Sequence, residues 1–130
     1  MRRRLALIAA LPLLMAPAVA HANEKKKGGG ATYRQFPTLT ANVSRADGRR
    51  GVFTVEAGVD TPDPAMFERG NQMVPRLRAA YTSTVSTFAA ALRPGMVPNL
   101  DLLSRQLQAD TDAVMGKRGA RLLLGTCLVN

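Results

Sequence analysis

The sequence predicts an α+β domain in which two helices pack on one face of a small antiparallel sheet. Two early segments alternate apolar and polar residues around a glycine-containing turn, as the strands of a hairpin do. Two longer segments then repeat apolar residues at steps of three and four, as amphipathic helices do. A short apolar run follows and is long enough for a closing strand. The expected order of elements is therefore β-β-α-α-β.

The hairpin is predicted from two alternating runs. Apolar and polar residues alternate between Tyr33 and Val43, and the alternation returns from Val52 to Val59. This period of two is typical of strands that bury one face. The dipeptide Asp47-Gly48 between the runs favours a turn, because Gly tolerates backbone angles that other residues avoid. We therefore expect an antiparallel pair.

The first helix is expected to begin at Asp63-Pro64, where the Asp side chain can cap free amides and Pro suits the first helical turn. Gly70 and Pro75 are expected to weaken or kink it. Beyond them the helical spacing is regular until Arg93-Pro94-Gly95 ends the pattern. The stripe predicted to face the core comprises Val74, Leu77, Tyr81, Val85, Phe88 and Leu92.

The second helix is expected to follow Pro98-Asn99, with Asn99 as its cap. The glycines of residues 116–119 are expected to end it, because Gly favours the left-handed conformation that closes helices. Ala120 to Val129 then predicts a largely buried third strand. The apolar stripe predicted for this second helix comprises Leu100, Leu103, Leu107 and Val114.

The first twenty-two residues have the three-part pattern of a cleavable export signal. Three arginines precede an apolar run from Leu5 to Ala20, and the small residues Ala20 and Ala22 fit a signal peptidase that cleaves before Asn23. The alternative is an uncleaved inner-membrane anchor. The run has sixteen residues, whereas a bilayer core requires roughly 20. Export to the periplasm is therefore predicted, by the Sec route or, given Arg2-Arg3, the twin-arginine route.

The mature chain is predicted to hold one domain. Residues 23–32 predict a flexible tether, because three lysines repel one another and three glycines remove stiffness. Residues 33–130 are enough for a single small domain. Without the signal, fifteen Lys and Arg face nine Asp and Glu, a net charge of +6. That charge favours solubility and would also suit an anionic membrane surface or an acidic envelope polymer; nucleic acid is not an expected partner of an exported protein.

The sequence offers no recognisable catalytic motif. The single histidine, His21, lies within the predicted signal, so the mature chain has no imidazole for catalysis or metal binding. Asp60 and Asp63 flank a Thr-Pro step and are interpreted as turn and cap residues. Asp110 and Asp112 are two apart on a helix and point to different faces. We therefore predict a protein that is not an enzyme, with no catalytic, cofactor-binding or metal-binding residue and no evident small-molecule substrate.

The only cysteine, Cys127, is expected to be a packed core thiol. It lies in a C-terminal apolar run where a small side chain can be buried, and no second cysteine exists to form a disulfide. A reactive thiol would need a positively charged and partly open environment. Packing is therefore the predicted role of this residue.

Several segments together resemble a known family. The aromatic start at residues 33–36 leads through Thr40-Ala41-Asn42-Val43 to the second strand, and Pro75-Arg76-Leu77-Arg78 leads the long helix. Leu103 to Val114 then precedes the last strand. Over Tyr33 to Asn130 this arrangement resembles the periplasmic domain of the FliL family of flagellar basal-body-associated proteins. The resemblance implies a non-enzymatic domain, similar to the stomatin and prohibitin core, that assembles around the stator units of the flagellar motor.

The expected function is that of an exported accessory or scaffold domain of the bacterial cell envelope that binds a protein partner or a second copy of itself. The alternative is a periplasmic or secreted protein that binds an envelope polymer or partner in another role. The outer face of the first long helix is the predicted contact surface, because it combines small and polar side chains, although such a face can also be simply solvated. Its residues are Arg76, Ala79, Ser83, Ser86 and Ala90.

We predict that the mature protein begins at Asn23, because the triplet that ends at Ala22 follows an apolar run too short to span a membrane. Intact-mass measurement of the protein from separated cell fractions checks this. Recovery of a membrane-bound species that retains Arg2 would contradict cleavage and support the anchor.

Overall fold

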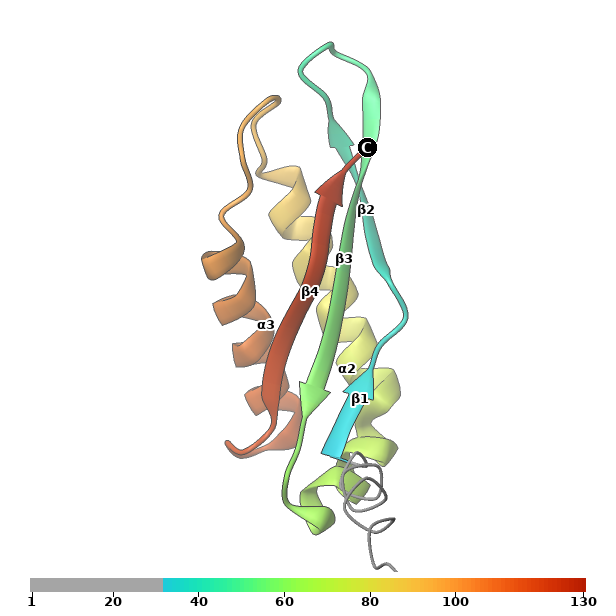
Figure 1. The fold of residues 1–130 in the computed structure, drawn as a ribbon, viewed down its shortest axis with the longest axis vertical. Coiled ribbons are helices and arrows are strands. Elements are labelled where there is room, and N and C mark those ends of the chain that lie inside the picture. Colours follow the sequence, from blue (N-terminus) through green and yellow to red (C-terminus); the bar gives the residue numbers. More distant parts are fainter. Residues whose placement is uncertain (1–31) are drawn as a thin grey trace, which may run out of the picture.

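A computed structural model describes residues 32–130 of the chain. The predicted signal, its cleavage residues Ala20, Ala22 and Asn23, and all of the predicted tether except Thr32 lie outside these residues. The α+β class is confirmed, because residues 32–130 form two helices and an antiparallel sheet of four strands (Figure 1). In chain order the elements are β1 (Tyr33–Gln35), β2 (Leu39–Ser44), β3 (Arg50–Asp60), α2 (Pro64–Ala90), α3 (Leu100–Met115) and β4 (Arg121–Val129).

The predicted first strand is divided into β1 and β2, so the order is β-β-β-α-α-β. Both pieces pair with β3 along the same edge, with Tyr33 opposite Asp60 and Leu39 opposite Val55. The break falls at Pro37, which has no N–H to contribute to a ladder. The N–H of Phe36 still donates to the carbonyl of Ala57 at 3.0 Å. The two pieces therefore continue one line along β3.

The hairpin turn between β2 and β3 forms where the sequence predicts it. Gly48 has a φ of 79°, and its N–H donates to the carbonyl of Arg45 at 3.0 Å. Asp47 stabilises the turn by accepting the N–H of Arg49 on its side chain. The hairpin extends beyond the rest of the sheet at the end where the chain terminates (Figure 1).

Strand β4 pairs with the other edge of β3 and contains a β-bulge. It is mostly exposed rather than largely buried as predicted, because it lies at the edge of the sheet, and Leu122 is its one buried residue. Val55 lies opposite Cys127, whereas Ala57 lies opposite Leu124, so two β4 residues share the single β3 residue between them. An extra residue reverses which side chains face each side of a sheet. Because of the bulge, Leu124 and Cys127 both face the helices, and so does Val129, which pairs with Phe53 on the helix side of β3.

The core lies between the helices and one face of the sheet, and Figure 1 shows both helices on that same side. Two aromatic contacts connect the layers. The rings of Phe36 and Tyr81 meet edge to face at 5.2 Å, and those of Phe53 and Phe88 stack at 5.8 Å. The largest fully buried side chains are Tyr81, Phe53, Leu77, Leu103, Leu107, Met115, Val55, Val85 and Thr111.

Helix α2 is a single helix, so the expected weakening at Gly70 and Pro75 does not break it. Asp63 caps its start by accepting the N–H of Ala65 at 3.3 Å, as predicted. Gly70 is buried against the end of Met115, whereas Pro75 lies on the exposed side. Packing against the core on both sides of these residues holds the helix together despite their low propensity.

Both predicted stripes require correction. In α2, Leu77 and Phe88 are buried as predicted, but Val74 is half-buried, and Leu92 lies beyond the end of the helix and is also half-buried. In α3, which Asn99 caps as predicted, Leu103 is buried but Leu100, at the first position of the helix, is exposed. The last two turns instead bury Thr111 and Met115, and Val114 is only half-buried.

A buried hydrogen-bond chain joins the two helices. The hydroxyl of Thr111 donates to the carbonyl of Leu107, in the preceding turn of α3, at 2.8 Å, which uses its only proton. The hydroxyl of Tyr81 lies 2.6 Å from the Thr111 oxygen and must therefore be the donor in that pair. Burial raises the pKa of Tyr81 to about 12, because the phenolate would lose its hydration. This chain satisfies the polar atoms that the helix interface buries.

We predict that Tyr81→Phe lowers the free energy of unfolding by about 1 kcal/mol at pH 8, the net value of a buried hydrogen bond. The pH dependence has a definite sign. Unfolded Tyr81 ionises near pH 10 but folded Tyr81 only near 12, so above pH 10 ionisation stabilises the unfolded state alone and the free energy of unfolding falls as pH rises. By pH 11 the wild-type protein should lose about 1.4 kcal/mol that the variant does not lose. Urea unfolding at both pH values, in a Cys127→Ala background, measures this; equal losses in both proteins would contradict it.

Candidate binding groove

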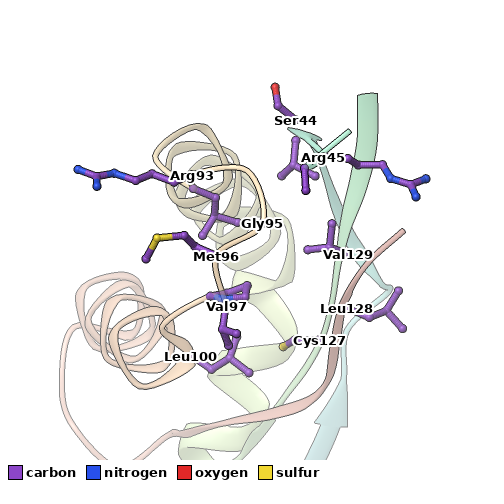
Figure 2. Close-up of a pocket in the computed structure, with 14 residues that line it drawn as sticks. Ser44, Arg45, Arg93, Gly95, Met96, Val97, Leu100, Cys127, Leu128 and Val129 are labelled. Atoms are coloured by element: carbon purple, nitrogen blue, oxygen red, sulfur yellow. The ribbon is translucent and has the colours of Figure 1, made fainter. Parts of the chain in front are cut away.

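A groove of about 430 Å³ opens at the hairpin end of the domain, between β4 and the connection from α2 to α3 (Figure 2). We call it the β4 groove. Its walls are mainly apolar, with Val97 and Leu100 from the connection and the start of α3 on one side, and Cys127 and Val129 from β4 on the other. The end of β2 and the start of the hairpin turn, residues 43–46, also line it. In Figure 2, Cys127 and Val129 point from β4 toward the segment that carries Val97. The groove is therefore an open apolar cleft formed by three segments that are distant in sequence, residues 43–46, 92–100 and 127–129.

The connection from α2 to α3 exposes apolar side chains. Gly95 has a φ of 79° and turns the chain, and the N–H of Met96 closes the turn onto the carbonyl of Arg93 at 3.1 Å. The side chains that follow are held away from the sheet. Met96 is 60% exposed and Val97 is 89% exposed. Such exposure loses the stabilisation that burial would give and is typical of a surface that another molecule covers.

The edges of the β4 groove are positively charged. Arg45 and Arg93 line it, with their guanidinium ends directed outward in opposite directions in Figure 2, and among residues 32–130 no Asp or Glu lines it. Arg45 approaches the carboxylate of Asp47 only at 3.9 Å, and both side chains are about half exposed. Such an exposed pair is weak and leaves the arginine available to a ligand.

The thiol of Cys127 is not fully buried, so the expectation of a core position needs correction. Cys127 packs against the core but is half-buried, because nothing among the described residues covers β4 beside the groove. Its sulfur lies 3.9 Å from the carbonyl of Gly125, too far for a strong hydrogen bond. Burial, and secondarily the negative charge of Glu56, raises the pKa of the Cys127 thiol. The thiol is therefore accessible but weakly acidic.

The beginning of β4 is covered by a side chain that imitates a neighbouring strand. The amide nitrogen of Gln108 donates to the carbonyl of Ala120, and its amide oxygen accepts the N–H of Leu122, both at 2.8 Å. These two bonds are the ones that a peptide group of an adjacent strand would make. Gln108 therefore closes the sheet edge near the end of α3.

Further along β4 this edge has no such cover. Backbone groups in an antiparallel ladder point alternately toward and away from the paired strand. Asn130 exchanges two hydrogen bonds of 3.0 Å with Val52, so its backbone groups point toward β3. At the other end of the strand, the N–H of Leu122 donates to Gln108 and therefore points away from β3. Counted from these two ends across the bulge, three residues point their backbone groups away from β3 and have no backbone partner among residues 32–130. They are Leu124, Cys127 and Val129.

The contact surface predicted from sequence lies on the side of α2 opposite the sheet. Arg76 and Ala90 are exposed there, whereas the other three residues line a shallow depression that does not include those two. The structure therefore brings most of the set together, and its role in binding stays a prediction. The three residues in the depression are Ala79, Ser83 and Ser86.

Sequence reasoning missed the β4 groove. The local signal was present: Met96 and Val97 are two apolar residues inside a segment that Pro and Gly mark as a loop. Whether these two residues form a groove depends on β4, which lies some thirty residues later, and on the bulge that turns Cys127 toward them. The groove could therefore be recognised only after the strand and the connection had been placed side by side.

Neither a protein-family model nor a curated protein matches this sequence. Within residues 32–130, no group of three His, Cys, Asp or Glu side chains is placed to hold a metal ion. In the same range, neither helix combines the length and apolar character that a bilayer crossing requires.

We predict that the Cys127 thiol of the folded protein reacts with a small thiol reagent more slowly than the thiol of the urea-unfolded protein at pH 8. The groove admits the reagent, but the raised pKa leaves less of the reactive thiolate. The difference should narrow as pH rises through the folded pKa. Stopped-flow labelling over a pH series measures both rates. Equal rates at pH 8 would contradict the raised pKa, and no reaction at high pH would contradict access through the groove.

Proposed function

We propose that this protein is an exported, non-enzymatic accessory domain of the bacterial cell envelope that works in the periplasm by holding another envelope protein. The observation that carries the proposal is the β4 groove, with its apolar walls, charged edges and exposed Met96 and Val97. Contiguous exposed apolar surface with a polar rim is typical of protein interaction sites. The predicted export signal supplies the compartment.

The resemblance to the FliL periplasmic domain supports the flagellar basal body as the place of action. It spans the whole described domain, from Tyr33 to Asn130, and includes the segment Pro75-Arg76-Leu77-Arg78 in α2. On this proposal the domain contacts a component of the motor and carries out no chemistry of its own. The contact would be made at the hairpin end, where the β4 groove opens.

A second candidate function is binding of an acidic envelope polymer or an anionic membrane surface. The observation in its favour is the cluster of Arg45, Arg49 and Arg50 at the turn of the β2–β3 hairpin, where Asp47 is the single acid of residues 44–50. Binding of this kind depends on charge and weakens as salt screens it. It would not require the apolar walls of the groove, which gives a way to separate the two functions.

We predict that deletion of the gene alters swimming or the response of the motor to load, and that crosslinking in cells recovers a basal-body or stator protein. Val97→Glu should abolish the crosslink, because it puts a charge on the apolar wall while the exposed side chain leaves the core intact. Ala79→Glu, on the outer face of α2, is the matched control and should retain the crosslink.

The opposite pattern, loss with Ala79→Glu and retention with Val97→Glu, would move the contact to the helix face. A normally motile deletion strain from which no motor protein is recovered would contradict the flagellar assignment. Salt-sensitive binding to purified envelope polymer that Val97→Glu does not affect would favour the second candidate.

A further inference from the structure

We propose that one end of the domain docks on the surface of a lipid bilayer that contains anionic phospholipid, with the Met96 side chain inserted among the acyl chains and arginine side chains on the lipid phosphates. This end comprises residues 45–50 and 93–97, and we call it the loop tip. The inference rests on the second candidate function and goes beyond it, because it selects the membrane surface over the polymer and locates the contact. It leaves the β4 groove to the protein partner.

Two loops that are distant in sequence form the loop tip as one surface. The β2–β3 hairpin and the connection from α2 to α3 both extend beyond the helices at the same end of the domain (Figure 1). The loops lie in contact, because a Cβ atom added at Gly95 would lie 3.3 Å from the Cβ of Ala46. Each loop contains a hydrogen-bonded turn, closed by the N–H groups of Gly48 and Met96. The loop tip is therefore a preformed, projecting surface.

Met96 is the apolar side chain that the loop tip presents. It is 60% exposed, and in Figure 2 it points away from Cys127 and Val129, whereas Val97 lies on the side of the groove. A protein partner would need a matching pocket and a broad contact to cover Met96, since standard interfaces bury about 800 Å² on each partner. A bilayer accepts a flexible apolar side chain at its headgroup boundary without such a pocket. The shape of the loop tip therefore favours lipid.

Positive charge surrounds Met96. In Figure 2 the guanidinium ends of Arg45 and Arg93 are directed outward in opposite directions, with Met96 between them. An apolar centre with a cationic rim follows the order of layers in a bilayer, where anionic phosphates lie above the hydrocarbon. A guanidinium can bind phosphate through two parallel hydrogen bonds, and its long stem lets it stay at the headgroups while Met96 lies deeper. Against the single acid Asp47, the loop tip has four arginines: Arg45, Arg49, Arg50 and Arg93.

The test uses the protein purified from cells, in a flotation assay with lipid vesicles. We expect binding to vesicles of equal parts phosphatidylglycerol and phosphatidylcholine, and binding weaker by about tenfold or more to pure phosphatidylcholine. Arg49→Glu should weaken binding to the anionic vesicles about tenfold. Arg105→Glu is the matched control and should weaken binding less, because it makes the same charge change on an exposed part of α3 outside the loop tip.

The apolar contribution is tested at Met96 itself. Met96→Gln removes the apolar end of the side chain with little change of length and should weaken binding to the anionic vesicles about fivefold, whereas Met96→Leu should retain it. Because Met96 is exposed, both variants should keep the melting temperature of the wild-type protein, which shows that the fold is intact.

A single tryptophan reports whether the loop tip enters the bilayer. The chain contains no Trp, so Met96→Trp provides a fluorophore at the loop tip alone, and Ala109→Trp provides one on an exposed part of α3 as the control. Bromine atoms attached to the acyl chains should quench the fluorescence of Met96→Trp and leave that of Ala109→Trp unchanged. Quenching of Ala109→Trp instead would assign the contact to the helices and overturn the proposal.

Two other results would overturn the proposal. Binding that salt abolishes, but that Met96→Gln does not reduce and bromine does not quench, would show contact through charge alone, as with an acidic polymer. Absence of binding to the anionic vesicles would exclude the bilayer and leave the loop tip to a protein partner.

These outcomes are separate from those of the proposed function. If Val97→Glu abolishes the crosslink in cells but the protein does not bind the vesicles, the lipid contact fails while the binding role of the groove stands. If the protein binds the vesicles through Met96 but cells yield no envelope partner, the reverse holds.

Discussion

Strand β3 is the element on which the described domain depends. It pairs with β1 and β2 along one edge and with β4 along the other, and its alternate residues from Phe53 to Val59 supply the largest share of the buried core residues that come from the sheet. Because side chains alternate strictly along a strand, one register error in β3 would turn this apolar set toward water. The helices stabilise the register from one side only, through contacts such as Phe53 with Phe88. The opposite face of the sheet is free of both helices.

Local chemistry predicted most of the elements. The caps at Asp63 and Asn99, the turn at Gly48 and the stop at Gly116 are where the sequence places them, because each depends on a few neighbouring residues. Features that depend on residues distant in the sequence were harder to predict. The burial of Thr111 follows from its hydrogen bond to Tyr81, thirty residues away in the chain, and no helical period of apolar residues reveals it.

The candidate site was the harder part to predict, for a related reason. A contact surface on the outer face of α2 could be inferred from residues such as Ala79 and Ser83 on one helix. The β4 groove instead requires that α3 diverge from β4 at Leu100, and that a polar side chain, Gln108, hold the two together farther along. Both are consequences of packing between elements. The sequence shows only apolar residues in a loop, such as Val97, and such residues do not by themselves predict a binding site.

The bulge in β4 decides where this strand can change in length. Removal of Gly125 or Thr126 would leave one residue opposite Glu56 in place of two, so Cys127 would stay opposite Val55 and on the helix side of the sheet. Removal of Leu128 would instead turn Val129 to the open face, and the groove would lose that part of its wall. Among related chains, the spacing between Cys127 and Val129 would therefore matter more to the groove than the spacing between Leu124 and Cys127.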